Sequence, residues 1–332
     1  MELQDFYNRI NLNTDLSNIS ENICSTYNLG KHISDEILEI GYEDFNYILI
    51  STTGKYFIKI LYSGRDNAEA ESYVERINAI SNSKVSFPKA LKINDKILYN
   101  IKINKIEYRI IVFEYINGEN LFSLKHIPSN QELQEISKQI KYIHDIDIKP
   151  EFIYDSWAIC NFIEEYNKKE KFLPEEYKKK IKSIYNKYKN VDMNDLKYAF
   201  VHGDVMNTNV MKDNNNKLWI IDIAVSNYLP RIVDLVVTAA NLCTIEESKE
   251  ETYKRISILL KEYTVDTNLT PKEKENFKLF FDVTNAMYIL QSSYQKNIGN
   301  ISEENNYWFT KGCTGLKFSD DINFNEIFKS LK

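Results

Sequence analysis

Residues 201–209 read V-H-G-D-V-M-N-T-N, and a further acid, Asp222, ends the apolar run that follows. Apolar, strand-like segments lie on both sides of this polar loop. Glycine, aspartate and asparagine are the commonest turn formers, so one interpretation is an ordinary surface turn. The other interpretation is a site that holds metal and phosphate, and the spacing of the polar residues decides between them.

The spacing H-G-D-x-x-x-x-N, from His202 to Asn209, matches the catalytic-loop pattern of kinases. In that pattern the aspartate accepts the proton of the attacking hydroxyl and the asparagine ligates a metal on the nucleotide phosphates. We therefore expect Asp204 to be a general base and Asn209 to be a metal ligand.

The residues after this loop predict a hairpin that brings Asn209 to Asp222. If Asn215 and Asn216 form a two-residue turn, which asparagine favours because it tolerates positive φ, the register sets Asn209 opposite Asp222. A carboxylate beside an amide oxygen suits Mg²⁺, which takes few protein ligands and fills its octahedron with phosphate oxygens and water. A longer turn would shift this register, and Asp222 taken alone fits the simple end of a strand.

A lysine interrupts an apolar strand pattern upstream. In Y-F-I-K-I-L (56–61), Lys59 shares one face with Phe57 and Leu61 because side chains alternate along a strand. Lysine is rarely buried without a partner, so Lys59 either snorkels to water or holds nucleotide phosphates with help from a glutamate of the next helix. Three glutamates are available there: Glu69, Glu71 and Glu75. Glu71 fits best because it borders the apolar stripe of that helix.

Composition excludes several classes of protein. A chain of 332 residues is too long for one simple core, which favours two lobes. The net charge of -6 argues against a nucleic-acid binder, because affinity for phosphate backbones comes from clustered lysine and arginine. The four cysteines lack the spacing of a zinc ribbon or a disulfide framework, and no stretch approaches the ~20 apolar residues of a membrane span. We expect a cytoplasmic protein with no nucleic-acid or membrane partner; its oligomeric state stays open.

The first third of the chain predicts an antiparallel sheet with one main helix. Three short β-rich runs lie between residues 37 and 61, a helix is predicted over 68–80, and further strands over 96–103 and 107–115. Gly41, in the first turn, would let a hairpin approach phosphates closely, although a single glycine is a weak signal and G-x-G-x-x-G is absent.

After residues 117–118 the pattern becomes helical. Three helix starts have the capping-box pattern of serine or threonine with glutamate three residues later: Ser129–Glu132, Thr244–Glu247 and Thr270–Glu273. Apolar residues on nearly every side of 277–289 predict a buried helix. The lysine-rich stretch 167–189 is typical of a solvated helix face.

Over roughly residues 37–235 the chain resembles the aminoglycoside phosphotransferase and choline kinase-like family of small-molecule kinases. The likeness rests on V-H-G-D-V-M-N-T-N-V-M, W-I-I-D, P-R-I-V-D-L-V and the strand that carries Lys59. It implies an α+β, protein-kinase-like bilobal fold. Residues 1–116 would form a nucleotide-binding lobe, with a small antiparallel sheet, one main helix and a helical N-terminal extension. Residues 117–332 would form a larger, mainly helical lobe for catalysis and substrate binding.

The resemblance also implies a reaction and its participants. The γ-phosphate of ATP would move to the hydroxyl of a small molecule with the help of Mg²⁺. Asp204 would be the base, Asn209 and Asp222 would bind Mg²⁺, and Lys59 would bind phosphate. The segment from Glu114 to Ile116 would be the hinge whose backbone meets adenine.

Two residues would support the catalytic loop: His202 and Asp234, the latter resembling the family's buried acid that braces this loop. The segment after Asp222 departs from the family, because Ile223-Ala224-Val225 stands where many members have an aromatic residue followed by glycine or a second acid. H-G-D replaces H-R-D, and both D-F-G and A-P-E are absent, which argues against a kinase of proteins.

The acceptor residues are expected in the helical lobe, in two regions that contribute to the acceptor site in the family resembled. Carboxylates and aromatic rings occur in both: Asp155, Trp157, Glu164, Tyr288 and Trp308. Such a group suits a cation, through Coulomb attraction and cation–π contact. We therefore expect an amine-bearing acceptor, such as an aminoglycoside or an amino alcohol. Taken singly, each of these residues fits a solvated helix face or a core position better.

The alternative from another class is a nucleotide-binding module without turnover, a pseudokinase or scaffold. The joint presence of Asp204, Asn209, Asp222 and Lys59 counts against it, because a protein that only binds nucleotide has no physical need for a base.

Overall fold

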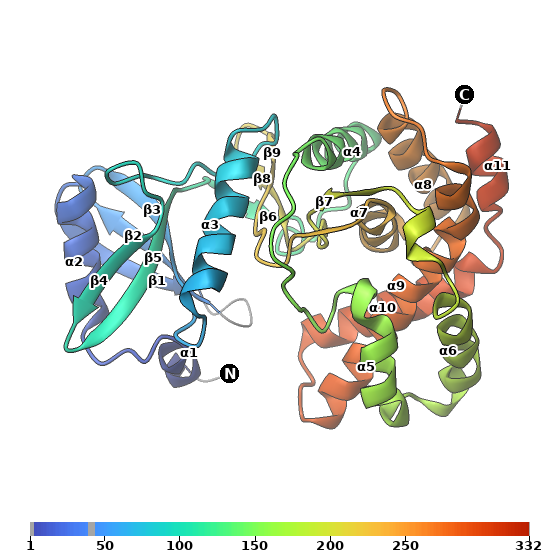
Figure 1. Ribbon diagram of the computed structural model, residues 1–332, viewed down its shortest axis with the longest axis horizontal. Helices are drawn as coiled ribbons and strands as arrows, with labels where there is room; N and C mark the ends of the chain where they lie inside the picture. Colours follow the sequence, from blue (N-terminus) through green and yellow to red (C-terminus); the bar gives the residue numbers. More distant parts are fainter. Residues whose placement is uncertain (1–2, 39–43, 332) are drawn as a thin grey trace. The chain divides into compact units, whose positions relative to one another are not determined.

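The computed structural model describes residues 3–38 and 44–331; Gly41, the expected hairpin glycine, lies outside them. The chain divides into two compact units (Figure 1). One contains Met1–Asn82 and Phe87–Gly118, and the other contains Ser83–Ser86 and Glu119–Lys332. The functional names that the sequence suggests for residues 1–116 and 117–332 remain predictions.

The first unit is built on an antiparallel sheet of five strands in the order β1-β2-β3-β5-β4. Its strands are β1 (His32–Leu38), β2 (Phe45–Ser51), β3 (Gly54–Ile60), β4 (Tyr99–Ile103) and β5 (Ile106–Glu114). Strand β1 begins at His32, earlier than expected. It is a largely accessible edge strand, so its first residues are polar and lack the apolar pattern by which a strand is predicted. Strand β4 begins later than expected, at Tyr99.

Helices lie on both sides of this sheet (Figure 1). Helices α1 (Leu3–Arg9) and α2 (Leu16–Tyr27) bury one sheet face. Alternate strand residues supply that core: Phe45, Tyr47, Leu49, Ile58, Ile60, Tyr108, Ile110 and Val112. Helix α3 (Asn67–Ser81), which confirms the helix expected over 68–80, lies on the other side, where Lys59 points.

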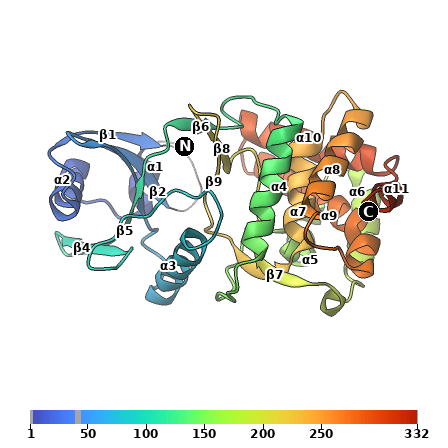
Figure 2. The same cartoon turned by 90° about the horizontal axis from the view of Figure 1, so that it is seen from above.

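The second unit is mainly helical. Its helices are α4 (Asn130–His144), α5 (Phe162–Lys169), α6 (Glu175–Tyr188), α7 (Ile232–Thr238), α8 (Lys249–Tyr263), α9 (Pro271–Asn297), α10 (Glu303–Ser319) and α11 (Phe324–Lys329). Helix α9 packs against α6, α7 and α10 (Figures 1 and 2) and is buried from Phe280 to Ser293, which confirms the buried helix. Within residues 3–38 and 44–331, no helix is long and apolar enough to cross a membrane.

Two of the three expected capping boxes are confirmed, at Ser129 and Thr270. The helix start expected at Thr244 is wrong. A π-helical turn (Ala239–Cys243) ends there, and the buried Thr244 hydroxyl donates back to Ala239 O (3.4 Å). Helix α8 starts instead after Ser248, whose Oγ accepts from Glu251 N (3.1 Å). Ser248 and Glu251 have the same spacing as Thr244 and Glu247, so the spacing alone cannot predict which of the two pairs begins the helix.

The lysine-rich stretch 167–189 contains two helices, because Leu173 and Pro174 separate α5 from α6. On α6 the apolar side chains are buried: Ile181, Ile184, Tyr185 and Tyr188. The lysines between them, such as Lys182 and Lys187, face solvent, which confirms the solvated helix face.

Candidate active site

The catalytic loop leaves β7 (Tyr198–Val201), which pairs with β10 (Asn227–Pro230), and it is braced by Asp234 on α7. The carboxylate of Asp234 accepts from the backbone N–H of His202 (2.9 Å) and of Gly203 (2.6 Å). Gly203 has φ +83°, a left-handed conformation that favours glycine. The glycine of H-G-D therefore turns the chain over a buried acid.

A third donor reaches Asp234 from α4. His144 Nε2 lies 3.0 Å from Asp234 Oδ2, and His144 Nδ1 lies 2.8 Å from the Tyr263 hydroxyl. Burial by itself raises the pKa of Asp234, but the hydrogen bond and charge of His144 outweigh it and the pKa is lowered overall. Asp234 therefore remains an anion inside the protein.

His202 is held as the neutral tautomer. Its Nδ1 accepts from Asp204 N (3.2 Å), so Nε2 carries the proton and donates to Ile221 O (3.0 Å). Burial lowers the pKa of His202, which agrees with a neutral ring. The ring thereby joins the catalytic loop to the residue just before Asp222.

Asp204 and Asn209 are in direct contact. Asn209 Nδ2 donates to Asp204 Oδ2 (2.6 Å) and to the Asp204 carbonyl (3.0 Å). Burial raises the pKa of Asp204 to about 8, and the charges of Asp155 and Asp222 add to this effect. The carboxylate of Asp204 is therefore repelled by the charges of both Asp155 and Asp222.

The hairpin between β8 (Val210–Asp213) and β9 (Leu218–Ile220) corrects the expected register. These strands form a three-stranded sheet with β6 (Gly118–Asn120), in the order β6-β8-β9. Val210 faces Ile220 and Met211 faces Trp219, so the turn is longer than two residues. Asn209 O accepts from Ile221 N (2.9 Å), and the expected cross-strand pairing of Asn209 with Asp222 is wrong.

Asp213 is the physical reason why the turn between β8 and β9 is longer than expected. Its carboxylate accepts from the backbone N–H of Asn215 (2.8 Å) and of Lys217 (2.9 Å), which stabilises the longer turn. Asn216 takes the left-handed conformation there, with φ +63°.

Asp222 lies two residues beyond β9 and is exposed, with φ +59°. Its Oδ1 accepts from Ala224 N (3.2 Å), and the next side chain, Ile223, is fully buried. The departure Ile223-Ala224-Val225 thus forms a turn anchored by an apolar residue, with the carboxylate of Asp222 at the surface.

Asn209 and Asp222 offer an amide oxygen and a carboxylate, which are donor types that Mg²⁺ accepts. The amide nitrogen of Asn209 is directed at Asp204, so its oxygen is the atom left to face a metal. In residues 3–38 and 44–331, no group of three His, Cys, Asp or Glu side chains is placed to hold a metal. A metal here would take most of its ligands from phosphate and water, as Mg²⁺ commonly does.

In the first unit, Lys59 is buried on the α3 face of the sheet and its Nζ lies 3.4 Å from Asp44 Oδ2. Asp44 directly precedes β2, the strand that pairs with β3, and it also accepts from Arg65 Nε (3.2 Å). The expected pairing with Glu71 is not found among the described residues. Glu71 points to solvent because the buried stripe of α3 runs through other positions, and Glu69 caps its own helix.

The hinge residues lie at the end of β5. Glu114 is exposed, and its side chain pairs with Lys89 (3.5 Å). Ile116 O accepts from Gly118 N (3.0 Å), so the chain turns directly after the strand. A role for Glu114 to Ile116 in holding adenine remains a prediction.

The structure brings some of the expected acceptor residues to the catalytic loop. Tyr288 on α9 donates to Met206 Sδ (3.0 Å), and its ring lies 5.5 Å from that of Trp308 on α10. Asp155 acts on Asp204 through its charge. The backbone N–H of Trp157, two residues later, donates to Asp155 Oδ1 (3.1 Å).

Glu164, by contrast, is exposed and pairs with Lys168 on its own helix (2.7 Å). This contact is typical of a solvated helix face.

Residues 36–255 match the model of the phosphotransferase enzyme family, a range that includes Lys59, Asp204, Asn209 and Asp222. The chain belongs to the phosphotransferase enzyme family. This confirms the family inferred from H-G-D-x-x-x-x-N and its neighbouring motifs, and with it a small-molecule phosphotransferase.

Solved structures with the same fold confirm the fold class. An amicoumacin kinase in complex with AMP-PNP, Ca²⁺ and Ami is 14% identical, with a TM-score of 0.68 over 98% of this chain and 99% of that one. Choline kinase LicA from Streptococcus pneumoniae is 15% identical, with a TM-score of 0.59 over 92% and 99%. A spectinomycin phosphotransferase in complex with ADP and spectinomycin is 16% identical, with a TM-score of 0.60 over 95% and 97%. No curated protein sequence was found to match.

Several residues at this phosphotransferase site were not predicted from the sequence. His144 ends an apolar stripe and carries no signal of its contact with Asp234. Asn207 binds Asn241 Oδ1 through its backbone N–H (2.9 Å) and the Tyr307 hydroxyl through its side chain (2.9 Å). Tyr307 itself lies beside Trp308, in a region that the sequence already suggested for the acceptor site.

Proposed function

We propose that this phosphotransferase moves the γ-phosphate of Mg-ATP to a hydroxyl of an amine-bearing small molecule. The observation that carries the proposal is the gathering of Asp155, Asp204 and Asp222 at the catalytic loop. Neighbouring carboxylates repel one another, so cations that bind among them are favoured. A metal beside Asp222 and an ammonium group beside Asp155 would relieve this repulsion.

Asp204 would accept the proton of the acceptor hydroxyl. The hydroxyl oxygen forms a bond to the γ-phosphorus while the bond from that phosphorus to the β–γ bridging oxygen breaks, and ADP leaves. A positive charge bound nearby lowers the pKa of Asp204 and keeps its carboxylate in the ionised form that can take the proton. Asn209 holds this carboxylate in place through its amide N–H.

The proposed nucleotide contacts are two side chains for the metal, a lysine for phosphate and backbone groups for adenine. Asn209 Oδ1 and the carboxylate of Asp222 are the proposed ligands of Mg²⁺, which neutralises phosphate charge when bound. Lys59 is the proposed phosphate contact, with Asp44 orienting its ammonium group. The backbone of the segment from Glu114 to Ile116 is the proposed adenine contact.

The acceptor would lie between a carboxylate and aromatic rings. Tyr288, Tyr307 and Trp308 pack together, with ring centroids 4.9 Å apart for Tyr307 and Trp308, and they touch the catalytic loop through Met206. Such rings attract an ammonium group by about 0.5–2 kcal/mol. Structures of the same fold include a choline kinase and an aminopropanol kinase, which supports this class of acceptor.

The test is an acceptor panel at fixed Mg-ATP, with ADP release as the readout. Choline, aminopropanol and spectinomycin would be compared with glycerol, at low and at raised salt. We expect an amine to be phosphorylated faster than glycerol, with a Michaelis constant that rises with salt because screening weakens the attraction. In Asp204→Asn, turnover should fall by ~10²-fold or more, the usual loss with a general base, while the melting temperature stays close to that of the wild type.

Faster phosphorylation of glycerol than of every amine would contradict the amine-bearing class. If no acceptor consumes ATP although Mg-AMP-PNP raises the melting temperature, the binding module without turnover is the better description.

A further inference from the structure

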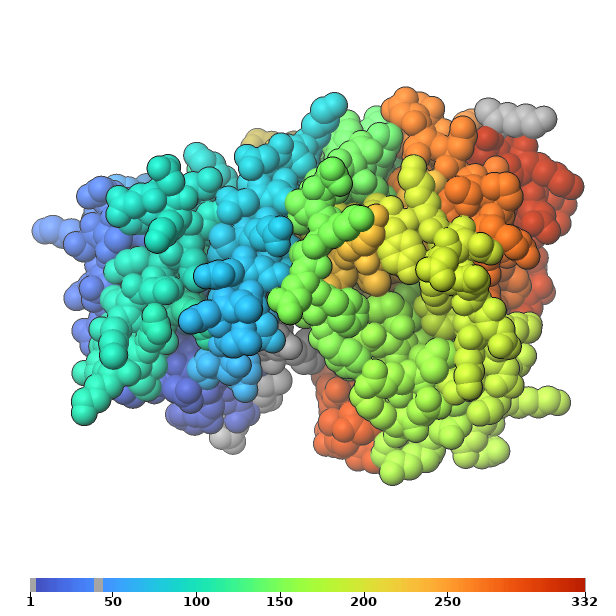
Figure 3. Space-filling view, viewed as in Figure 1, coloured from blue at the N-terminus to red at the C-terminus, as the bar shows by residue number. Residues whose placement is uncertain are grey.

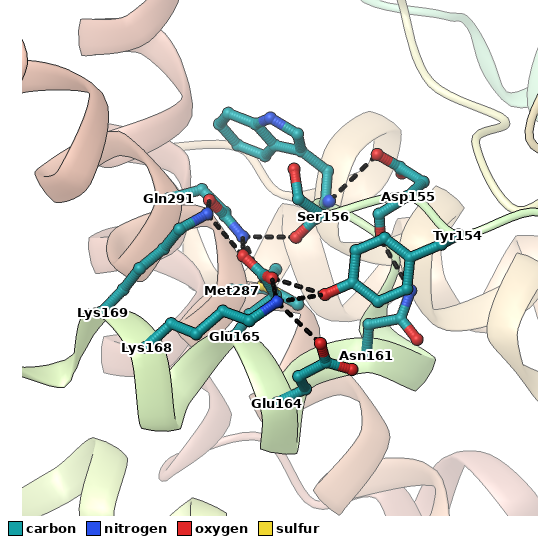
Figure 4. Close-up of polar contacts among 11 residues, drawn as sticks. Tyr154, Asp155, Ser156, Asn161, Glu164, Glu165, Lys168, Lys169, Met287 and Gln291 are labelled. Carbon is teal, nitrogen blue, oxygen red and sulfur yellow. Dashed lines mark hydrogen bonds and ion pairs between the residues drawn. The ribbon is translucent and has the colours of Figure 1, made fainter.

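A buried carboxylate on α5, Glu165, has no part in the steps above. Its side chain is 2% exposed, although α5 lies at the surface of the second unit. Oε1 accepts from the Tyr154 hydroxyl (2.5 Å) and from Lys168 (3.3 Å), and Oε2 accepts from Gln291 Nε2 (2.9 Å) and pairs with Lys169 (Figure 4). Burial by itself raises the pKa of Glu165, but the hydrogen bonds outweigh it and lower the pKa to about 2, so the group is an anion.

Gln291, on α9, extends this network to the chain before α5. Its Oε1 accepts from Lys169 (2.7 Å), and its Nε2 donates both to Glu165 and to the backbone carbonyl of Ser156 (Figure 4). Gln291 is fully buried and uses both ends of its amide.

Residues 153–156 are therefore held on both sides of Asp155. Ile153 exchanges two backbone hydrogen bonds with the side chain of Asn227 (2.8 and 2.9 Å). Tyr154 is bound through its hydroxyl by Glu165, and Ser156 through its carbonyl by Gln291. Asp155 stands between these anchors.

Apolar packing alone does not explain the placement of this segment. Phe152 is 52% exposed and Tyr154 is 42% exposed, and the chain between α4 and α5 lies at the surface (green in Figure 3). Buried ion pairs add little net stability, because the desolvation of both charges offsets their attraction. Networks whose hydrogen bonds are all satisfied do, however, specify one geometry.

We propose that Glu165 and Gln291 are positioning residues that hold Asp155 at the acceptor site, so that contacts of α5 and α9 set the affinity for the amine-bearing acceptor. This rests on the proposed function, in which Asp155 meets the ammonium group. Neither residue touches substrate in this scheme. Glu165 acts through the side chain of Tyr154, and Gln291 acts through the backbone carbonyl of Ser156, on either side of Asp155.

Three variants test the network, each removing a different contact. Glu165→Gln removes the charge, and Gln291→Met removes the donor to Ser156 at similar volume. Tyr154→Phe removes only the hydroxyl of a partly exposed side chain, so this variant is expected to fold even if the other two do not. Glu175→Gln is the matched control, since Glu175 also lies in the first turn of a helix and pairs with a lysine, Lys178 (2.7 Å).

The first measurement is steady-state kinetics with choline and aminopropanol. In the three variants we expect the Michaelis constant for the acceptor to rise about tenfold, because small displacements of binding groups cost one to two orders of magnitude. The Michaelis constant for Mg-ATP should stay within about twofold, a separation that general loss of structure would not produce. Glu175→Gln should match the wild type in both constants.

The second measurement is amide hydrogen exchange of residues 153–161, which needs no turnover. We expect faster exchange in the three variants and no change in the control. Unchanged exchange in the variants that fold would overturn the proposal. Faster exchange with an unchanged acceptor constant would overturn its link to the acceptor. If no acceptor is phosphorylated even by the wild type, the proposed function fails, and the exchange data still decide whether Glu165 and Gln291 hold the segment.

Discussion

One buried aspartate shows how single residues organise this site. Asp234 is fully buried, which is unfavourable for a charge unless it is paired and hydrogen-bonded. Its oxygens accept from two consecutive backbone N–H groups, at His202 and Gly203, and from the imidazole of His144. The desolvation of the acid is thus offset by contacts that fix the backbone just before Asp204. The backbone conformation before Asp204 and the local stability depend on the same carboxylate.

Because His202 is neutral in the folded protein, we expect the free energy of unfolding to fall in mild acid. Its pKa is lowered in the folded protein, so the unfolded chain binds its proton at higher pH than the folded chain does. The contribution of His202 is complete above the unfolded value of about 6.5 and is lost as the pH falls through the lower folded value, by up to about 1.4 kcal/mol per pH unit. Urea unfolding at pH 7.5, 6.5 and 5.5 measures this loss.

The comparison variant is His202→Gln, which keeps a donor for Ile221 O and does not titrate. Its free energy of unfolding should depend less on pH over this window than that of the wild type, whatever its absolute stability. Equal slopes in the two proteins would show that His202 is not the group responsible.

At the scale of elements, local spacing predicted two of the three expected capping boxes and failed at Thr244. The capping boxes of α4 and α9 are formed by residues three positions apart, so they could be predicted from the sequence. The β8–β9 turn depends instead on which of several polar residues closes it, and the carboxylate of Asp213 selects the longer turn over the two-residue turn of Asn215 and Asn216. One side chain thereby changes the register of the whole hairpin.

The left-handed conformation of Asn216 predicts the response of this hairpin to substitution. Asn216→Gly should be neutral or slightly stabilising, whereas Asn216→Val should lower the free energy of unfolding by about 1–2 kcal/mol, because a β-branched residue is strained at positive φ. Denaturant unfolding measures both changes. Asn214→Val is the control in the same turn, where φ is not positive. An equal loss in both valine variants would contradict the argument from φ.

At the scale of the whole molecule, each unit has a core of its own: the sheet with α1 and α2 in the first, and the helices around α9 in the second. A ligand that binds only the folded protein raises its stability by mass action, by about 2.7 kcal/mol at a concentration of 100 times its dissociation constant. The melting temperature of the intact chain is therefore a direct measure of nucleotide binding.

The melting temperature also provides a test of the proposed Mg²⁺ ligands. Mg²⁺ should increase the thermal shift that AMP-PNP produces in the wild type. The Mg²⁺-dependent part should disappear in Asp222→Ala and weaken in Asn209→Ala, because these residues are the proposed ligands. Asp321→Ala, which removes an exposed carboxylate that pairs with Lys249 (3.3 Å), is the control. An undiminished effect of Mg²⁺ in both ligand variants would assign the metal to other groups.

The sequence by itself determined the features that depend on neighbours along the chain. Alternation and helical spacing predicted β2, β3, β5, α3 and α9. The spacing H-G-D-x-x-x-x-N singled out Asp204 and Asn209, which lie 2.6 Å apart in one loop, and their roles as base and metal ligand stay predictions. Within a strand, a helix or a short loop, backbone geometry converts a spacing in sequence into a distance in space.

Only the tertiary structure decided which distant segments supply the hydrogen-bond and ion-pair partners of the site residues. Lys59 pairs with Asp44 and not with Glu71, because the buried face of α3 is chosen by packing against the sheet. His144 reaches Asp234 from a separate helix, and Gln291 on α9 reaches the chain beside Asp155. Such contacts join residues far apart in the chain, and no periodicity encodes them, because they arise from how whole elements pack.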